Sequence, residues 1–167
     1  SVPYNTLLTE PTPPTKTGYT FKGWDIGIDG DLLRWDFENT KMTNQDATLY
    51  AQWEANLNTV KFDLNGGTSA PIADNKVPTD GLISKPTDPE KTGHTFVAWN
   101  TSINGDGEDW DFAIDKMPAT DITLYAQWTL DSYEMTFDLS GGTGIAPAQT
   151  IDYGAKAVEP TKPTRTG

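Results

Sequence analysis

The sequence contains no cysteine. Without thiols the chain has no disulfide, no thiolate nucleophile and no cysteine-based zinc site. It also has no apolar run long enough to cross a membrane, and no charged-then-apolar leader segment at its start. We therefore expect no membrane insertion. A repeated pattern is interrupted at both ends, so we expect the chain to be a fragment of a longer protein.

Basic residues are few. Twelve lysines and arginines stand against 24 aspartates and glutamates, which gives a net charge of -12. Such a charge repels phosphate backbones and anionic membrane surfaces, so nucleic acid is not an expected partner. The simpler consequence of this acidity is that it keeps a surface-displayed protein soluble.

The residues that are abundant predict a folded, strand-rich chain. Six tryptophans and an aromatic content of 11% supply large apolar anchors, as disordered chains do not. Fifteen glycines and 12 prolines favour strands and turns over long helices. No segment shows a long 3.6-residue period, so any helix is expected to be short.

The chain repeats itself. Residues 1–53 align with residues 76–128 at a constant offset without gaps, and 27 of the 53 positions are identical. A third copy begins with MTFDLSGG, which matches VKFDLNGG in the second. We therefore predict copy 1 at residues 1–53, lacking its first strand, a complete copy 2 at 60–128, and the start of copy 3 at 135–167. Residues 54–59 and 129–134 are predicted to be short connectors.

The aromatic residues recur in register. All six tryptophans and all six phenylalanines form pairs between copies at the repeat offset. Side chains of this size dominate core energetics, so the simplest interpretation is a core built more than once. The alternative is a set of exposed tryptophan platforms used for multivalent binding. The predicted structural core comprises Phe21, Trp24, Trp35, Phe37, Leu49, Trp53, Phe62, Phe96, Trp99, Trp110, Phe112, Leu124, Trp128 and Phe137.

Local patterns predict a hairpin at the start of the complete copy. Residues 59–64 alternate apolar and polar, the period of a half-buried strand. Asn65-Gly66-Gly67 then needs positive φ angles, which glycine adopts at little cost. A second strand is expected near Val77, with counterparts near Val2 in copy 1 and near Ile151 in copy 3.

The middle of the repeat is predicted to be a stiff crossover followed by a second hairpin. Repeated X-Pro bonds at 85–91 forbid a central strand. Phe21 and Trp24 are three residues apart within a strand-like segment, so a β-bulge is expected near Gly23, and likewise near Ala98. Turns are expected at residues 29–31 and 104–106, and the closing LYAQW segment is expected to be a strand.

The combination of FDLNGG, KTG-Y/H-TF, WDF, KM and TLYAQW resembles the Listeria-Bacteroides repeat, the B repeat of internalin-type bacterial surface proteins, over almost the entire chain. The resemblance implies a mainly β or α+β class, with tandem small β-grasp-like (ubiquitin-like) repeat domains in an elongated array. It also implies an extracellular, cell-wall-anchored protein of a Gram-positive bacterium. The sequence departs from the family pattern at Ala98-Trp99-Asn100, which puts only the bulge geometry in doubt.

No catalytic residue, cofactor or metal ligand is predicted. The family carries no catalytic motif, and His94, the one histidine, has Tyr19 as its counterpart, which suits a flat amphipathic side chain on a strand. Aspartates recur in each copy, but turn capping is ordinary for them, whereas an active site in every repeat would be unusual. They are Asp36 with Asp111, Asp46 with Asp121, and Asp63 with Asp138.

Two further segments carry residues that could form a site. Residues 104–109 (NGDGED) carry oxygen ligands at spacings that calcium can use, but the copy 1 counterpart turns apolar and basic, which favours a solvated hairpin tip. Lys41 and Lys116 recur and invite an isopeptide cross-link. The sequence assigns them no acidic partner.

The leading functional hypothesis is a non-catalytic stalk or spacer module. The alternative is an adhesion module whose repeats make multivalent weak contacts with a host-cell surface protein or glycan. Self-association through exposed repeat edges is a third possibility. Surface positions differ between copies, as Lys22 becomes Val97 and Arg34 becomes Asp109, and this favours the spacer.

Overall fold

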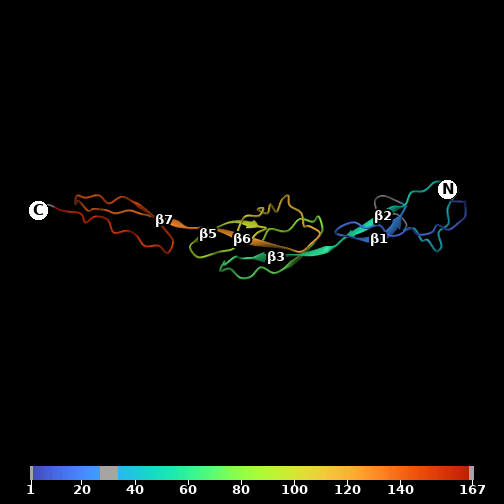
Figure 1. Cartoon of the computed structure of the whole chain (residues 1–167), viewed down its shortest axis with the longest axis horizontal. Helices are drawn as coiled ribbons and strands as arrows, with labels where there is room; N and C mark the ends of the chain where they lie inside the picture. The colour runs from blue at the N-terminus through green and yellow to red at the C-terminus, as the bar shows by residue number, and fades with distance from the viewer. Residues whose placement is uncertain (1, 27–33, 166–167) are drawn as a thin grey trace. The chain divides into compact units, whose positions relative to one another are not determined.

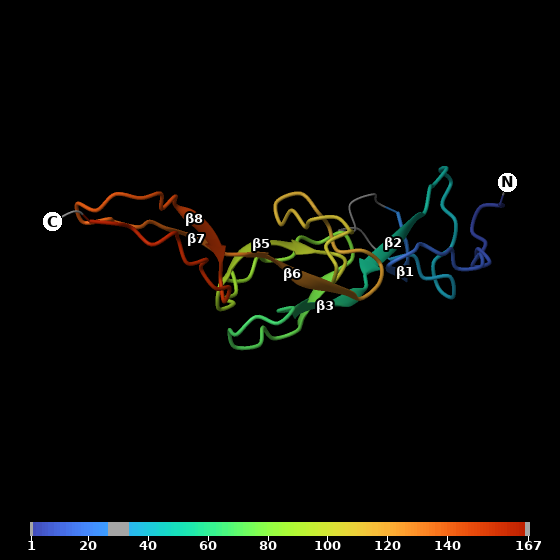
Figure 2. The ribbon, with the colours of Figure 1, turned by 60° about the vertical axis from the view of Figure 1, so that its left-hand side comes forward.

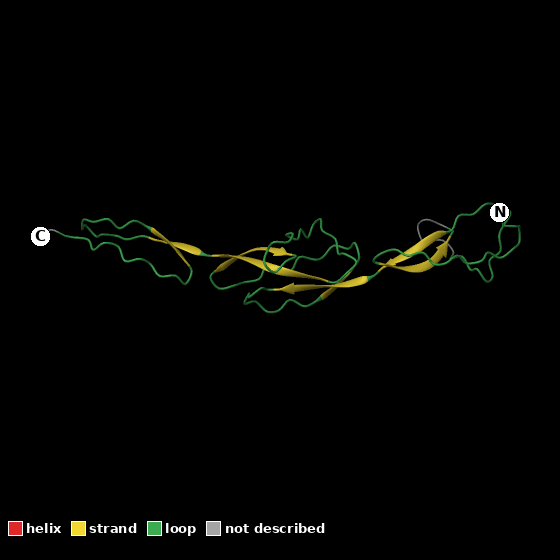
Figure 3. Cartoon of the chain, viewed as in Figure 1, coloured by secondary structure: helices red, strands yellow, loops and turns green. Residues whose placement is uncertain are grey.

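A computed structural model describes residues 2–26 and 34–165. The regular elements among these residues are strands, and none of them forms a helix (Figure 3). The mainly β class is therefore confirmed, and the described residues do not supply the helix of an α+β class. In chain order (Figure 1) the elements are β1 (Tyr19–Asp25), β2 (Tyr50–Ala55), β3 (Leu57–Asp63), β4 (Asn75–Pro78), β5 (His94–Asn100), β6 (Ile122–Leu130), β7 (Ser132–Met135) and β8 (Gln149–Asp152).

The chain forms two compact units, which are described separately. Unit 1 comprises Ser1–Val60, Asn75–Ser84 and Phe112–Ile122, and unit 2 comprises Lys61–Asp74, Lys85–Asp111 and Thr123–Gly167. Unit 1 thus contains the point where copy 1 leads into copy 2, and unit 2 the point where copy 2 leads into copy 3. The predicted repeat boundaries come from the period of the sequence, whereas the two units are defined by compactness. The units therefore do not test the boundaries, which stay a prediction.

Within residues 2–26 and 34–165 the strands form three sheets. The complete copy contributes a four-stranded sheet in the order β4-β3-β6-β5, while β1 pairs with β2 and β7 pairs with β8. The predicted second strands near Val77 and Ile151 are confirmed, because Val77 pairs antiparallel with Asn58 and Ile151 pairs with Tyr133. The strand expected near Val2 does not form: Val2 is 47% exposed, and no strand of copy 1 among the described residues lies where it could pair. The first and last strands of the complete copy, β3 and β6, are neighbours in the middle of its sheet.

Glycine serves the turn after β3 as predicted. Gly66 has φ 81° and Gly141 has φ 82°, while the preceding Asn65 and Ser140 also take positive φ. Two consecutive positive φ angles define a type I′ turn, which asparagine and glycine adopt most easily.

The predicted β-bulges are confirmed in both copies. The pairing register shifts between Phe21 and Gly23 in β1, and between Phe96 and Ala98 in β5. The extra residue of the bulge brings two aromatic side chains that are three residues apart onto the same face of the sheet. The Phe96 ring lies 5.6 Å from both Trp99 and Trp128, and Phe21 lies 5.5 Å from Trp24 and 5.6 Å from Trp53. These are the edge-on and tilted contacts that aromatic quadrupoles favour.

Burial of the predicted core residues is graded. Trp35, Trp99 and Leu124 are buried, and the other predicted core side chains are half-buried. A repeat of this size is thin, so large rings reach its surface. Several aliphatic side chains of the complete copy are also buried, namely Val60, Val77, Ile83, Met117 and Ala126.

The segments between hairpins also follow expectation. The proline-rich residues 85–90 form no strand and lead into a tight turn, closed by the His94 N–H donating to the Lys91 carbonyl at 3.0 Å. The turn expected at 104–106 is present, with Gly105 at φ 77°. The turn expected at 29–31 lies outside the described residues.

The buried Leu124 offers a test of this core. We expect Leu124→Ala to lower the free energy of unfolding by about 2–5 kcal/mol, because its side chain is 0% exposed and the cavity left behind cannot fill. Leu57→Ala is the matched control. Its side chain is 60% exposed, so the change should be within about 0.5 kcal/mol. Urea unfolding followed by tryptophan fluorescence measures both, and equal midpoints for the two variants would contradict the assignment.

Candidate functional site: the repeat joints

Successive copies are joined by single residues. In the ribbon β2 leads directly into β3 (Figure 2). β2 ends at Ala55 and β3 begins at Leu57, so only Asn56 lies between them. Asp131 alone separates β6 from β7. The connectors expected at 54–59 and 129–134 are therefore mostly strand residues. We call Asn56 and Asp131, together with the groups that bond to them, joint 1 and joint 2.

Three of the hydrogen bonds that hold Asn56 in joint 1 have counterparts in joint 2. Its N–H donates to the Gly18 carbonyl at 2.9 Å, and its own carbonyl accepts the Thr79 N–H at 2.8 Å. The Thr20 hydroxyl donates to the Asn56 side-chain oxygen at 2.6 Å. The connecting residue is thus bonded to the preceding copy and to the following hairpin at once.

Joint 2 repeats this pattern with different residues. The Asp131 N–H donates to the Gly93 carbonyl at 2.9 Å, and the Asp131 carbonyl accepts the Tyr153 N–H at 2.8 Å. The Thr95 hydroxyl donates to the Asp131 carboxylate at 2.7 Å. Two of the three bonds are backbone bonds, so the joint tolerates a change from asparagine to aspartate and from Thr79 to Tyr153.

Glycine is required at both joints for two reasons. Gly18 has φ 78° and Gly93 has φ 69°, which other residues adopt only with strain. A Cβ on Gly18 would also lie 2.6 Å from the Thr79 side chain, and a Cβ on Gly93 would lie 2.0 Å from the Tyr153 ring. The backbone at each joint therefore approaches the next copy more closely than any side chain would permit.

Joint 1 carries further bonds. The Tyr19 hydroxyl donates to the Asp80 carboxylate at 2.5 Å, and this bond raises the pKa of Tyr19 above its ordinary value. The Lys16 ammonium lies 3.7 Å from the centre of the Tyr19 ring, a cation–π contact. In joint 2 the corresponding positions hold His94 and Gly154, so this side-chain bond is specific to joint 1.

Four of the six recurring aspartates, namely Asp36, Asp63, Asp121 and Asp138, accept backbone N–H groups. Asp36 accepts the Glu38 N–H and both the backbone and side-chain N–H groups of Asn39, and these bonds, the Asn39 side chain foremost, lower its pKa. Asp63 and Asp138 each cap the turn that follows them. Asp121 accepts the Thr59 N–H at 2.6 Å. Asp46 and Asp111 are exposed. These are structural uses of a carboxylate.

The other candidate sites are also bonded internally. In the 104–109 segment, Asp106 accepts the Ser102 hydroxyl and Asp109 accepts the Asn100 amide at 2.8 Å. Across residues 2–26 and 34–165 no group of three histidine, aspartate or glutamate residues is placed to hold a metal ion. The same residues include no helix able to span a membrane.

His94 is half-buried, with its Nδ1 3.0 Å from the Thr92 carbonyl.

Comparison with known proteins gives a family match over most of the chain. Residues 1–52, 59–127 and 133–167 match the Listeria-Bacteroides repeat domain. Internalin H of Listeria monocytogenes is 46% identical over 125 residues, which are 75% of this chain and 22% of that protein. A "Putative membrane protein" of Evansella cellulosilytica is 37% identical over 166 residues, which are 98% of this chain and 24% of that protein. The chain thus spans about a quarter of the length of these relatives.

The close approach at joint 2 can be tested with matched glycine variants. We expect Gly93→Ala to open joint 2, so that hydrogen exchange at the Asp131 and Tyr153 amides becomes much faster. Gly141→Ala is the control, because Gly141 also has positive φ, at 82°, but its Cβ would meet nothing within 4 Å. The control should lose only the backbone strain energy of about 1–2 kcal/mol. Unchanged protection of both amides in Gly93→Ala would contradict the joint.

Proposed function

Because the chain belongs to the Listeria-Bacteroides repeat domain family, we propose that it is a non-catalytic stalk module of a bacterial cell-surface protein. The similarity to Internalin H and to a protein named as a membrane protein supports a location at the cell surface. The proposal adds that the parent protein is anchored in the cell wall. The observation that carries the stalk role is the pair of joints. A single connecting residue held by at least three hydrogen bonds restricts the angle between copies, so each added repeat adds a defined length.

The proposed architecture is a tandem array of β-grasp-like repeats. The sheet order β4-β3-β6-β5 supports it, because the first strand of one hairpin (β3) and the last strand of the other (β6) then lie side by side in the centre of the sheet. The crossover between the hairpins contains Pro86 and Pro89, which suits an extended segment there instead of a helix. A strand that runs from one copy into the next through Asn56 or Asp131 makes the array continuous.

Joint stiffness is the test of the stalk role. Since the chain has no native cysteine, spin labels can be placed on cysteines introduced at Glu38 and Ile114, both exposed. We expect double electron–electron resonance to give a narrow distance distribution across joint 1. A short Gly-Ser linker inserted after Asn56 should broaden it, because such linkers behave as flexible coils.

The same linker inserted after Asp131 is the matched control, since it changes joint 2 alone and should leave the joint 1 distribution narrow. If the unmodified chain is as broad as the variant with the linker after Asn56, the stalk proposal fails. Saturable binding to host cells that grows with repeat number would favour the adhesion alternative instead.

A second candidate function, self-association, is supported by the open strand edges of copies 1 and 3. Among the described residues β2 pairs only with β1, and β7 only with β8, whereas their counterparts β6 and β3 pair with each other in copy 2. Met135 is 44% exposed, although its counterpart Val60 is fully buried. Unpaired edges of this kind are templates for another chain.

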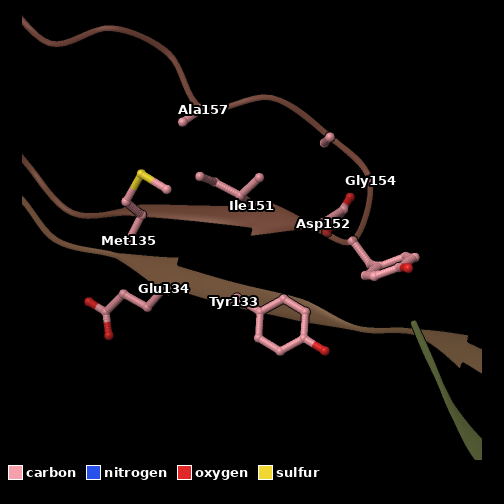
Figure 4. A pocket seen from close by; sticks show the side chains of 9 residues that line it. Tyr133, Glu134, Met135, Ile151, Asp152, Gly154 and Ala157 are labelled. Atoms are coloured by element: carbon pink, nitrogen blue, oxygen red, sulfur yellow. The ribbon is translucent and has the colours of Figure 1, made fainter. Parts of the chain in front are cut away.

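The face that would be covered is apolar. Tyr133, Met135, Ile151 and Ala157 are among the residues that line a pocket on the β7–β8 hairpin, and Figure 4 shows Met135, Ile151 and Ala157 around it. In copy 2 the counterparts of Ile151 and Ala157 are Val77 and Ile83, which are buried. We propose that β7 of one chain pairs with β2 of a second chain, as β3 pairs with β6.

Edge pairing can be removed without disturbing the hairpin. Glu134 corresponds to Thr59, whose N–H points away from β4 to Asp121. Glu134→Pro therefore removes an outward N–H, and proline is tolerated on an edge strand. We expect light scattering to show concentration-dependent association of the native chain and of Glu134→Ala, which keeps the N–H, but a monomer for Glu134→Pro. A strictly monomeric native chain at high concentration would refute this candidate.

A further inference from the structure

In the complete copy the strands at which the chain enters and leaves are neighbours in the sheet. The chain enters it through β3, directly after joint 1, and leaves it through β6, directly before joint 2. These two strands are hydrogen-bonded neighbours in the centre of the sheet. A pull on the chain from both sides would therefore act first on the contact between β3 and β6.

The two strands run in the same direction. Near the start of both strands the Thr59 N–H donates to Asp121 at 2.6 Å. Further along both, the Trp128 indole N–H donates to the Leu64 carbonyl at 3.0 Å. Contacts that advance together along two strands define a parallel pair. The point where the chain enters β3 and the point where it leaves β6 consequently lie at opposite ends of the pair.

We propose that the β3–β6 pair is a mechanical clamp that resists tension along the protein. With parallel strands pulled from opposite ends, the strands are sheared past one another, and the hydrogen bonds between them must break together. If both ends were pulled from the same side, the bonds would break one at a time. Forced unfolding is governed by the unfolding barrier, so shear loading raises the force required.

Side chains reinforce the clamp at its far end. The Asn65 amide donates to the Ala126 carbonyl at 3.0 Å, next to the Trp128 bond to Leu64. The Lys91 ammonium donates to the Asn65 carbonyl at 3.2 Å and so ties this turn to the segment before β5. With Asp121 holding Thr59 at the near end, the strand pair is fastened at both ends by bonds outside the ladder.

The clamp rests on the proposed stalk function, since a stalk is the kind of module that carries tension between a cell and whatever its protein holds. The two are nevertheless separable. Stiff joints fix the distance that a repeat spans, whereas the clamp fixes the force at which the repeat opens. A chain could have either property without the other.

The test compares two pulling directions in the full chain by single-molecule force spectroscopy. Cysteines at Leu57 and Leu130, which are 60% and 44% exposed, load the β3–β6 pair in shear. Cysteines at Leu57 and Thr120, also exposed, load the same pair from one end. Both pairs enclose most of the complete copy, so they release nearly equal contour lengths when it unfolds.

We expect the shear direction to need a severalfold higher unfolding force than the peeling direction at the same loading rate. Equal urea midpoints for the two cysteine variants would show that the difference is mechanical and not thermodynamic. Equal forces in the two directions would overturn the clamp. That result would leave a narrow spin-label distribution across joint 1, and with it the stalk proposal, standing.

Discussion

The structure depends on the constraint that only one residue separates the last strand of a copy from the first strand of the next. A backbone that changes sheets within a single residue has no slack, so its polar groups must bond where the two copies meet. Asn56 and Asp131 meet this demand with the same three hydrogen bonds. Gly18 and Gly93 are glycines for the same reason, since a Cβ at either position would overlap a side chain of the next copy. A longer connector would remove the need for all of these features.

Most of the fold within a copy was predictable because its determinants are local. Alternation gave the strand around Val60, and the spacing of Phe21 and Trp24 gave the bulge, since three residues cannot share a face without one. Glycine at positive φ gave the turn at Gly66. Pairing of aromatics between copies indicated the rings that meet around Phe96.

The joints could not be predicted in the same way. Self-alignment compares one copy with another, whereas each joint bond links residues of two adjacent copies, such as Thr20 with Asn56. The sequence did contain a signal, because a threonine, a glycine and an Asn or Asp recur at matching positions. The start of β3 at Leu57 could not be predicted from burial, because Leu57 is apolar but 60% exposed and so does not follow the alternation of the strand.

Differences between the copies argue for a mechanical role over a shared ligand. The bulged residue is Lys22 in copy 1, where it pairs with Glu54 at 2.8 Å, but Val97 in copy 2, where it is 57% exposed. A ligand that bound every repeat would need the same chemistry at such an exposed point, and the exchange of a cation for an apolar group removes it. The joints show the opposite behaviour, because Asn56 and Asp131 differ in charge and still make the same bonds. The exposed bulge residue therefore differs in chemistry between the copies, whereas the joint residues keep the same hydrogen-bond geometry.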